Sequence, residues 1–137
     1  MIFKIAGAFV FALLLLQCAV FQSAFSKGVV TSVTKEDAGK TVQIAVGGML
    51  QIELSGTPST GYWWYFELLN EEYLELFEEE TKKTSTETLL GAPIMGIWRL
   101  CAKRCGETTV KMAYYRPWEG STKAIDHFSI TVHIKNR

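Results

Sequence analysis

The sequence predicts an all-β fold, and three observations support this prediction. Apolar and polar residues alternate with a period of two over most of the chain after residue 40, which is typical of half-buried strands. The alternating runs are about five to eight residues long, and turns containing Gly or Pro separate them roughly every dozen residues. Only one stretch has a weakly helical composition. Together these features predict an immunoglobulin-like antiparallel β-sandwich of about seven strands.

Residues 1–26 have the composition of a secretory signal peptide. Lys4 supplies the positive charge, residues 5–16 form the apolar segment, and Ala-Phe-Ser at residues 24–26 forms a small-x-small cleavage site. A membrane anchor is the alternative, because the apolar character continues almost to the cleavage site and a spanning helix needs roughly 20 apolar residues. We favour cleavage, which leaves residues 27–137 as the mature chain.

The mature chain has the size of one domain. Removal of the first 26 of 137 residues leaves 111, which is enough for a single two-layer core. Lys4 is the one charged residue of the leader, so the 14 Lys and Arg fall to 13 against 14 Asp and Glu. This balance gives no electrostatic basis for nucleic acid or an anionic membrane as a partner. We expect a monomer.

The expected strands follow one another along the chain, and each has one apolar face. The pair Gly47-Gly48 marks the turn between the first two. We expect Trp64 and Trp98 to be central core residues and Trp63 to be partly exposed. In chain order, the predicted core faces are Val42, Ile44 and Val46; Leu50, Ile52 and Leu54; Tyr62, Trp64 and Phe66; Trp98, Leu100 and Ala102; Val110, Met112 and Tyr114; and Phe128, Ile130, Val132 and Ile134.

The segment 71–80 fits two structures. As a helix it would place Tyr73, Leu76 and Phe77 on one face, and it contains good helix formers. As an edge strand it would alternate Leu74 and Leu76 with glutamates. We favour the edge strand, because the sandwich needs a strand at this position.

Candidate catalytic groups are few. The two histidines, His127 and His133, are six residues apart on a predicted strand and therefore roughly 20 Å apart along it. A Ser or Cys nucleophile needs a His base within hydrogen-bond reach, and a zinc site needs three or four converging ligands. The sequence therefore predicts two solvated histidines in a protein that is not an enzyme and has neither a metal nor a cofactor.

Two cysteines remain in the mature chain, in a compartment that permits disulfides. Cys101 and Cys105 would be roughly 13 Å apart on a straight strand, which is beyond disulfide reach. A disulfide between them therefore requires a tight turn over residues 103–106. A bridge and two free thiols both remain open at this point.

The segment 57–62 has the composition of a stiff loop. Pro58 fixes one φ angle, and Gly61 permits a positive φ. Hydroxyl groups beside them can bond back to the loop backbone. An ordinary hairpin connection and a binding loop both fit this composition. The candidate contact residues are Thr57, Pro58, Ser59, Thr60, Gly61 and Tyr62.

Two further connections are candidate contact loops, and in a sandwich all three can gather at one end. Trp118 follows a proline where no strand period requires a core residue, so it is either a cap on the sandwich or an exposed anchor; Trp and Arg often dominate interfaces. Segment 89–96 is apolar where an exposed connection is usually polar, which marks a partner site. The candidates are Leu90, Gly91, Ala92, Pro93, Ile94, Met95, Tyr115, Arg116, Pro117 and Trp118.

The order and spacing of these motifs resemble those of the chagasin family of cysteine-peptidase inhibitors. Members of that family share a Pro-Thr-Thr-Gly-Tyr-like loop followed by a core Trp, a Gly-rich loop before a Trp-bearing strand, and an Arg-Pro-Trp loop. The resemblance covers essentially the whole mature chain. The matching segments are Thr57–Tyr62 with Trp64, Gly91-Ala92-Pro93 up to Trp98, Gly106-Glu107-Thr108, and Tyr115-Arg116-Pro117-Trp118-Glu119.

The resemblance implies an immunoglobulin-like fold without catalytic activity, and reversible inhibition of papain-like, cathepsin-type cysteine peptidases. It implies that loop 57–62 enters the centre of the protease cleft while loops 89–96 and 115–120 grip either side. Thr57 and Ser59 replace the Asn and Thr that are common in the family, which conserves short polar side chains. Ile94 stands where Gly is common, so we expect a different backbone path there, because a β-branched residue disfavours positive φ.

A function of another class remains open from the residues alone. In a secreted immunoglobulin-like adhesion or carbohydrate-binding module, Trp63, Tyr65 and Trp118 would be exposed and would stack on sugars. With the leader, either function places the protein in the secretory pathway. Its destination would be outside the cell, a lysosome or endosome, or the periplasm in a bacterium.

Overall fold

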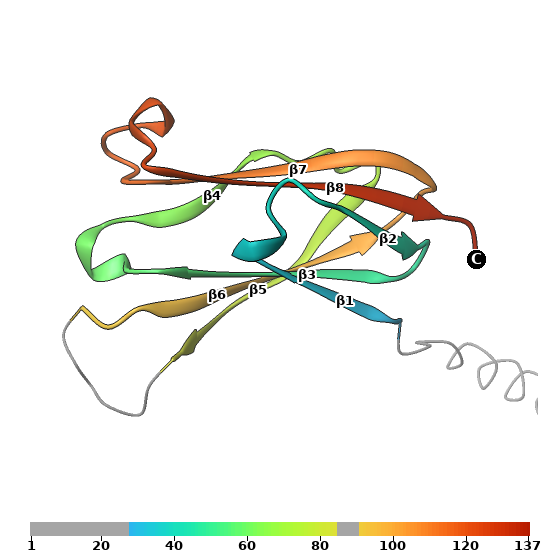
Figure 1. Cartoon of the computed structure of the whole chain (residues 1–137), viewed down its shortest axis with the longest axis horizontal. Coiled ribbons are helices and arrows are strands. Elements are labelled where there is room, and N and C mark those ends of the chain that lie inside the picture. Colours follow the sequence, from blue (N-terminus) through green and yellow to red (C-terminus); the bar gives the residue numbers. More distant parts are fainter. Residues whose placement is uncertain (1–27, 85–90) are drawn as a thin grey trace, which may run out of the picture.

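The computed structural model describes residues 28–84 and 91–137, and these form a two-layer β-sandwich (Figure 1). The predicted leader lies outside the described residues. Three short 3-10 turns join the strands: η1 (Lys35–Asp37), η2 (Pro58–Thr60) and η3 (Ser121–Lys123). The strands are β1 (Val30–Thr34), β2 (Thr41–Ala45), β3 (Met49–Gly56), β4 (Trp63–Leu68), β5 (Leu74–Lys83), β6 (Ile94–Ala102), β7 (Gly106–Tyr115) and β8 (Asp126–Lys135).

Each layer is a four-stranded sheet. One sheet has the order β1-β3-β6-β5 and the other β2-β8-β7-β4. The predicted immunoglobulin-like sandwich is confirmed, with eight strands among the described residues instead of about seven. The expectation of purely antiparallel pairing is wrong at two places, because β1 pairs in parallel with β3, and β2 in parallel with β8. Between β1 and β3 the chain crosses to β2 in the opposite sheet, and such a crossover is what permits parallel neighbours.

The period-two pattern places the core correctly. Trp64 and Trp98 are 4% and 1% exposed, as predicted for central core residues. The sequence pattern missed Val33, because it is the one fully buried residue of β1, whose other residues are Thr, Ser and an exposed Val. Half-buried residues at the margins of the predicted faces are Val42, Val46, Phe66 and Tyr114, and fully buried ones are Ile44, Leu50, Ile52, Leu54, Leu100, Ala102, Val110, Met112, Phe128, Ile130, Val132 and Ile134.

Segment 71–80 contributes to an edge strand, which confirms the preferred alternative. Its residues from Leu74 onward pair with β6 along the whole length of β5. A register shift between Leu76 and Glu78 leaves Phe77 61% exposed. Such a bulge twists an edge strand and discourages pairing with another chain.

The two cysteines are free thiols in the structure. Cys101 lies within β6, which stays extended as far as Ala102, and Cys105 lies in the turn before β7. Of the two alternatives that the sequence left open, the structure therefore has the unpaired one, because the extended strand keeps Cys101 from turning toward Cys105.

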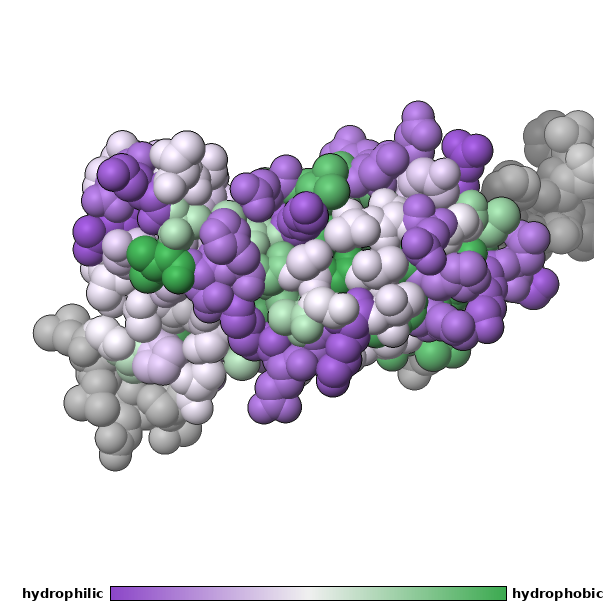
Figure 2. Space-filling view, turned by 45° about the horizontal axis from the view of Figure 1, so that its top comes forward, coloured by the Kyte–Doolittle hydropathy of each residue, from purple (hydrophilic) through white to green (hydrophobic). Residues whose placement is uncertain are grey.

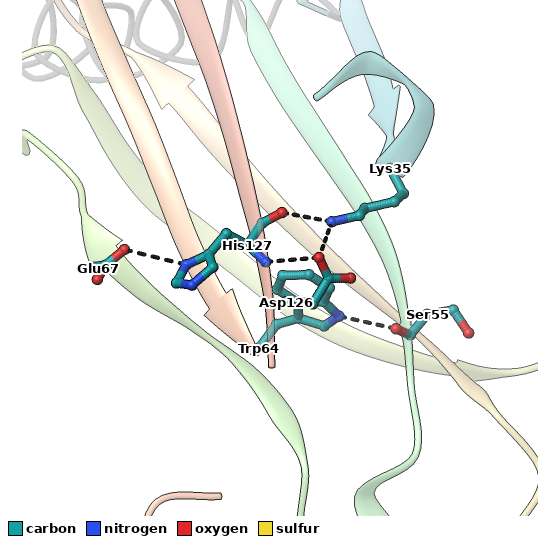
Figure 3. A network of polar contacts seen from close by, with 6 residues as sticks. All are labelled: Lys35, Ser55, Trp64, Glu67, Asp126 and His127. Atoms are coloured by element: carbon teal, nitrogen blue, oxygen red, sulfur yellow. Dashed lines mark hydrogen bonds and ion pairs between the residues drawn. The ribbon is translucent and has the colours of Figure 1, made fainter. Parts of the chain in front are cut away.

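A polar network fastens η1 to the sheet that carries β4 and β8 (Figure 3). Lys35 Nζ donates to Asp126 Oδ1 and to the His127 carbonyl oxygen, both at 2.6 Å. The same ammonium group lies 5.1 Å from the ring centroid of Trp64, whose Nε1 donates to the Ser55 carbonyl at 2.9 Å. These contacts join the end of β3 and the beginnings of β4 and β8, which are the strand ends next to two of the candidate loops.

Two glycines make room for indole rings at the same end of the sandwich. A Cβ at Gly96 would lie 2.3 Å from the ring of Trp98, and one at Gly56 would lie 2.8 Å from the ring of Trp63. The rings of Trp63 and Trp98 are 5.9 Å apart. Trp63 is half-buried, as predicted, but it packs against the core instead of standing free in solvent.

We predict that Gly96→Ala destabilises the fold by about 1–3 kcal/mol, because the added methyl group overpacks a site whose neighbour is the fully buried Trp98. Chemical denaturation of the purified domain measures the change in the free energy of unfolding. A change below about 0.5 kcal/mol, as is usual for surface substitutions, would contradict tight packing of Gly96 against Trp98.

Candidate functional site

The first two candidate loops and the described part of the third, from Gly91 onward, lie at one end of the sandwich (Figure 1). They connect β3 to β4, β5 to β6 and β7 to β8. Because Gly56 pairs with Ile94, the segment 91–93 joins the sheet directly beside the start of loop 57–62. Leu89 and Leu90 lie outside the described residues. The pairing of strands that are distant in the sequence thus brings these loop segments to the same end of the domain.

Loop 57–62 is closed by hydrogen bonds of its own. The N–H of Thr60 donates to the Thr57 carbonyl and the N–H of Gly61 donates to the Pro58 carbonyl, both at 2.9 Å. The Thr60 hydroxyl donates to the Thr57 carbonyl at 2.6 Å. Gly61 ends the η2 turn with φ of 88°, a left-handed conformation that favours glycine. The expected stiff loop is therefore a 3-10 turn with a glycine cap.

Tyr114 anchors this loop to the core. The N–H of Thr57 donates to the Tyr114 hydroxyl oxygen at 2.9 Å, and the two hydroxyl oxygens are 3.0 Å apart. The Tyr114 ring lies 5.0 Å from that of Trp64 and 5.6 Å from that of Tyr62. Sequence reasoning placed Tyr114 in the core without a role in the site. Its phenol at the last core-facing position of a strand is the signal that marks it as an anchor.

Arg116 joins the second loop to the first. Its Nε donates to the Thr60 carbonyl at 3.0 Å, and its guanidinium carbon lies 4.4 Å from the ring centroid of Tyr62. Its Nη1 is 3.7 Å from Glu119 Oε1, and the N–H of Glu119 donates to the Arg116 carbonyl at 3.0 Å. The guanidinium group is therefore held between the two loops. A direct contact of Arg116 with a binding partner remains a prediction from the sequence.

Trp118 is 70% exposed and yet packed along one edge. A Cβ at Gly61 would be 2.1 Å from the Trp118 ring, so the indole lies directly on the glycine. Ile125, in the same β7–β8 connection, is 63% exposed. In Figure 2, hydrophilic and intermediate residues cover most of the visible face, and a strongly hydrophobic group lies near the end that carries the loops. The exposure of Trp118 favours a contact anchor over a structural cap.

The described part of the third loop begins at Gly91, which is exposed with φ of 84°. The Thr84 hydroxyl donates to the Pro93 carbonyl at 2.7 Å, which ties the two ends of the loop together. Ile94 begins β6 and is extended, a conformation that suits a β-branched residue. In this described part of the loop, Gly91 is the residue with a positive φ. Ile94, at the position where the family resemblance leads one to expect Gly, is already part of a strand and needs no positive φ.

Candidate catalytic and metal-binding groups do not converge on one point in the part of the chain that the structure describes. The hydroxyl groups of Thr57 and Thr60 are 3.1 Å apart, and both histidines lie on β8, His127 near its start beside the β7–β8 loop and His133 toward its other end. His127 Nδ1 is 3.9 Å from Glu67 and His133 Nδ1 is 3.8 Å from Glu107, so each has a separate carboxylate partner. Over residues 28–84 and 91–137, no three His, Cys, Asp or Glu side chains come close enough to hold a metal ion. Nor does any helix in those ranges have the length and apolarity needed to cross a membrane.

The fold and the loop end together define a β-sandwich that presents preorganised loops for binding. Residues 43–132 match the family described as Chagasin family peptidase inhibitor I42, and the chain belongs to this family. The family is one of peptidase inhibitors, not of enzymes. The resemblance inferred from the loop motifs is thereby confirmed.

Known proteins of this kind are similar along most of the chain. Chagasin from Trypanosoma cruzi is 35% identical over 106 residues, which cover 75% of this chain and 94% of chagasin. The cysteine protease inhibitor EhICP2 from Entamoeba histolytica superimposes with a TM-score of 0.71 at 26% identity, covering 78% of this chain and 96% of that structure. PbICP-C, solved in complex with falcipain-2, has a TM-score of 0.52 at 18% identity, covers 80% of this chain and 100% of its own, and shares the fold.

We predict that Gly61→Ala lowers the free energy of unfolding by about 1 kcal/mol through its positive φ and also displaces the Trp118 ring. Gly91→Ala is the matched control, because Gly91 has a similar φ but no atom within 4 Å of the added Cβ. Both variants should lose similar stability. The NMR resonance of the Trp118 indole should move in Gly61→Ala. If it moved in neither variant, that result would contradict the packing of Trp118 on Gly61.

Proposed function

We propose that this chain is a reversible inhibitor of papain-like cysteine peptidases that blocks the active-site cleft with three loops. Loop 57–62 enters the centre of the cleft, and segments 89–96 and 115–120 contact either side. The observation that carries the proposal is the closed, core-anchored loop 57–62 beside an exposed Trp118, in a member of a peptidase-inhibitor family. Its similarity to chagasin and to EhICP2, a cysteine protease inhibitor, supports the class of target.

The proposed mechanism requires shape and rigidity only. An interface of the usual protease–inhibitor size buries about 800 Å² on each partner. Ordering of loops and side chains on association opposes binding, so loops that are already ordered retain more of the interaction energy. The internal bonds of loop 57–62 and its anchor at Tyr114 supply that order before the protease is met.

The same bonds explain how the loop would avoid cleavage. A substrate must present a carbonyl oxygen that is free to enter the oxyanion hole. In loop 57–62, the carbonyl oxygens of Thr57, Pro58 and Thr60 already accept hydrogen bonds from within the protein. The 3-10 backbone also holds the peptide groups in a turn. The loop therefore fills the cleft without presenting these peptide bonds for attack.

Titration of papain with purified residues 27–137 tests the proposal. We expect stoichiometric loss of activity, recovery of activity on dilution, and an intact inhibitor after the incubation. Unchanged papain activity at molar excess of the domain, or its hydrolysis as a substrate, would refute the proposed function. A serine protease such as trypsin is the control and should keep its activity.

We predict that Trp118→Ala weakens inhibition of papain by about 2 kcal/mol or more, with little change in stability, because the exposed indole is a contact anchor. Phe77→Ala is the matched control: Phe77 is also an exposed aromatic residue, but it lies on edge strand β5. Inhibition constants and denaturation midpoints are compared for both. A large loss of stability with unchanged inhibition would instead make Trp118 a structural cap.

The packing does not favour the adhesion or carbohydrate-binding alternative. That function needs exposed aromatic rings in a row, but Trp63 packs on Trp98 at 5.9 Å. Tyr65 lies 4.9 Å from Tyr115 and is only half exposed. Of these three residues, Trp118 is the one that is largely exposed. Trp63, Tyr65 and Trp118 therefore do not form the row of exposed rings that sugar binding would need.

We also propose that residues 1–26 direct the chain into the secretory pathway, toward the cell exterior, a lysosome or endosome, or a bacterial periplasm. The charged start, the apolar segment and the small-x-small site support this. When the full chain is expressed in a secreting host, we expect the N-terminus of the exported protein at or near Lys27. Recovery of a membrane-bound chain that still begins at Met1 would identify an anchor instead.

A further inference from the structure

We infer that Arg116 is a positioning residue, which locks loop 57–62 and the Trp118 loop into one rigid unit before any protease is bound. The inference rests on the proposed function for its consequence, but the locking is a property of the free protein. It assigns to Arg116 a role inside the molecule, in addition to its sequence-based prediction as a contact residue.

Arg116 contacts the central loop through two different parts of its side chain. The edge of the guanidinium group donates from Nε to the Thr60 carbonyl at 3.0 Å. Its face covers Tyr62, with the guanidinium carbon 4.4 Å from the ring centroid. Hydrogen bonds from charged donors are stronger than neutral ones, and a cation over an aromatic face adds a further attraction. Arg116 therefore restrains both the middle and the end of the loop.

The second loop is restrained by the same group. The guanidinium carbon of Arg116 lies 5.9 Å from the ring centroid of Trp118, and Glu119 pairs with Nη1 at 3.7 Å. Trp118 in turn lies on Gly61, so the two loops touch at a second point. Movement of either loop must disturb the other. The described part of the third loop is held differently, by the bond from Thr84 to Pro93.

Arginine suits this arrangement better than lysine. The guanidinium group is planar, so it can stack by its face while it donates in its plane. A lysine ammonium can donate to a carbonyl beside an aromatic ring, as Lys35 does at Trp64, but it has no flat face that stacks on Tyr62 as the guanidinium group does. Without Arg116, the Thr60 carbonyl loses its charged donor and the turn can open toward an extended, cleavable backbone. Arg116 would thus help to keep the inhibitor from becoming a substrate.

Amide hydrogen exchange in the free domain, followed by NMR, tests the locking directly. Arg116→Gln should speed exchange of the Thr60 and Gly61 amides by about tenfold, which corresponds to loss of one net hydrogen bond of a charged group. Global stability should change little, because the guanidinium group lies at the surface end. Arg116→Lys should exchange at a rate between those of the native domain and the Gln variant, because its ammonium group can still donate but does not stack on Tyr62. Full protection in the Lys variant would overturn the requirement for a planar group.

Arg104→Gln is the matched control. Arg104 lies 5.3 Å from the Tyr73 ring and pairs with Glu72 at 3.6 Å, so it makes contacts of the same kind. It is located in the β6–β7 turn, at the end of β6 away from the loops. We expect native exchange rates at residues 57–62 in this variant. Faster exchange there in Arg104→Gln would show a general effect of charge and would overturn the specific role of Arg116.

A second experiment incubates each variant with papain and measures whether the loop is cleaved. We expect Arg116→Gln to be cut within residues 57–62 during prolonged incubation, while the native domain stays intact. Unchanged amide exchange in Arg116→Gln overturns the positioning role even if inhibition falls, because the loss would then come from a direct contact. Faster exchange in a protein whose native form does not inhibit papain would leave the locking in place and refute the proposed function alone.

Discussion

The structure depends on a column of aromatic rings and cations in contact that runs from the core to the loop surface. Trp64 lies 5.0 Å from Tyr114, Tyr114 lies 5.6 Å from Tyr62, and the Arg116 guanidinium carbon lies 4.4 Å from Tyr62. At the other end, the exposed Lys35 places its ammonium group 5.1 Å from the ring centroid of Trp64. A cation therefore lies at each end of the three rings, Lys35 beside Trp64 and Arg116 beside Tyr62. The negative faces of aromatic rings favour this arrangement. The column connects the buried sheet interface to the loop at the surface.

This connection explains why a short loop can be stiff without a disulfide or a metal. The Tyr114 hydroxyl group at the end of a core strand holds the first residue of the loop, Thr57. Arg116 holds its middle through the Thr60 carbonyl, and the glycine cap at Gly61 completes the turn. Two of these restraints come from residues at or just after the end of β7, and the glycine cap lies within the loop itself. A member of a peptidase-inhibitor family thus has a loop that is ordered by the same packing that folds the domain, so that binding need not order it.

Sequence patterning predicted the layered fold because burial in a sandwich has the period of a strand. Ile130 and Val132 are fully buried as their alternation requires, and the edge strand at segment 71–80 is confirmed. The pattern failed where few buried residues define a strand, as in β1, whose fully buried residue is Val33. It could not distinguish parallel from antiparallel pairing at the edges, since both directions alternate in the same way.

The amino-acid sequence by itself determined the fold class, the core tryptophans Trp64 and Trp98, and the family, because periodicity and motif order are local or linear properties of the chain. Tertiary structure decided what each loop residue does. Arg116 and Thr60 are distant in sequence, so no local pattern shows that one donates to the carbonyl of the other. The contact of Trp118 with Gly61 likewise exists only after two sheets have brought their loops to one end, since side-chain packing depends on positions in space.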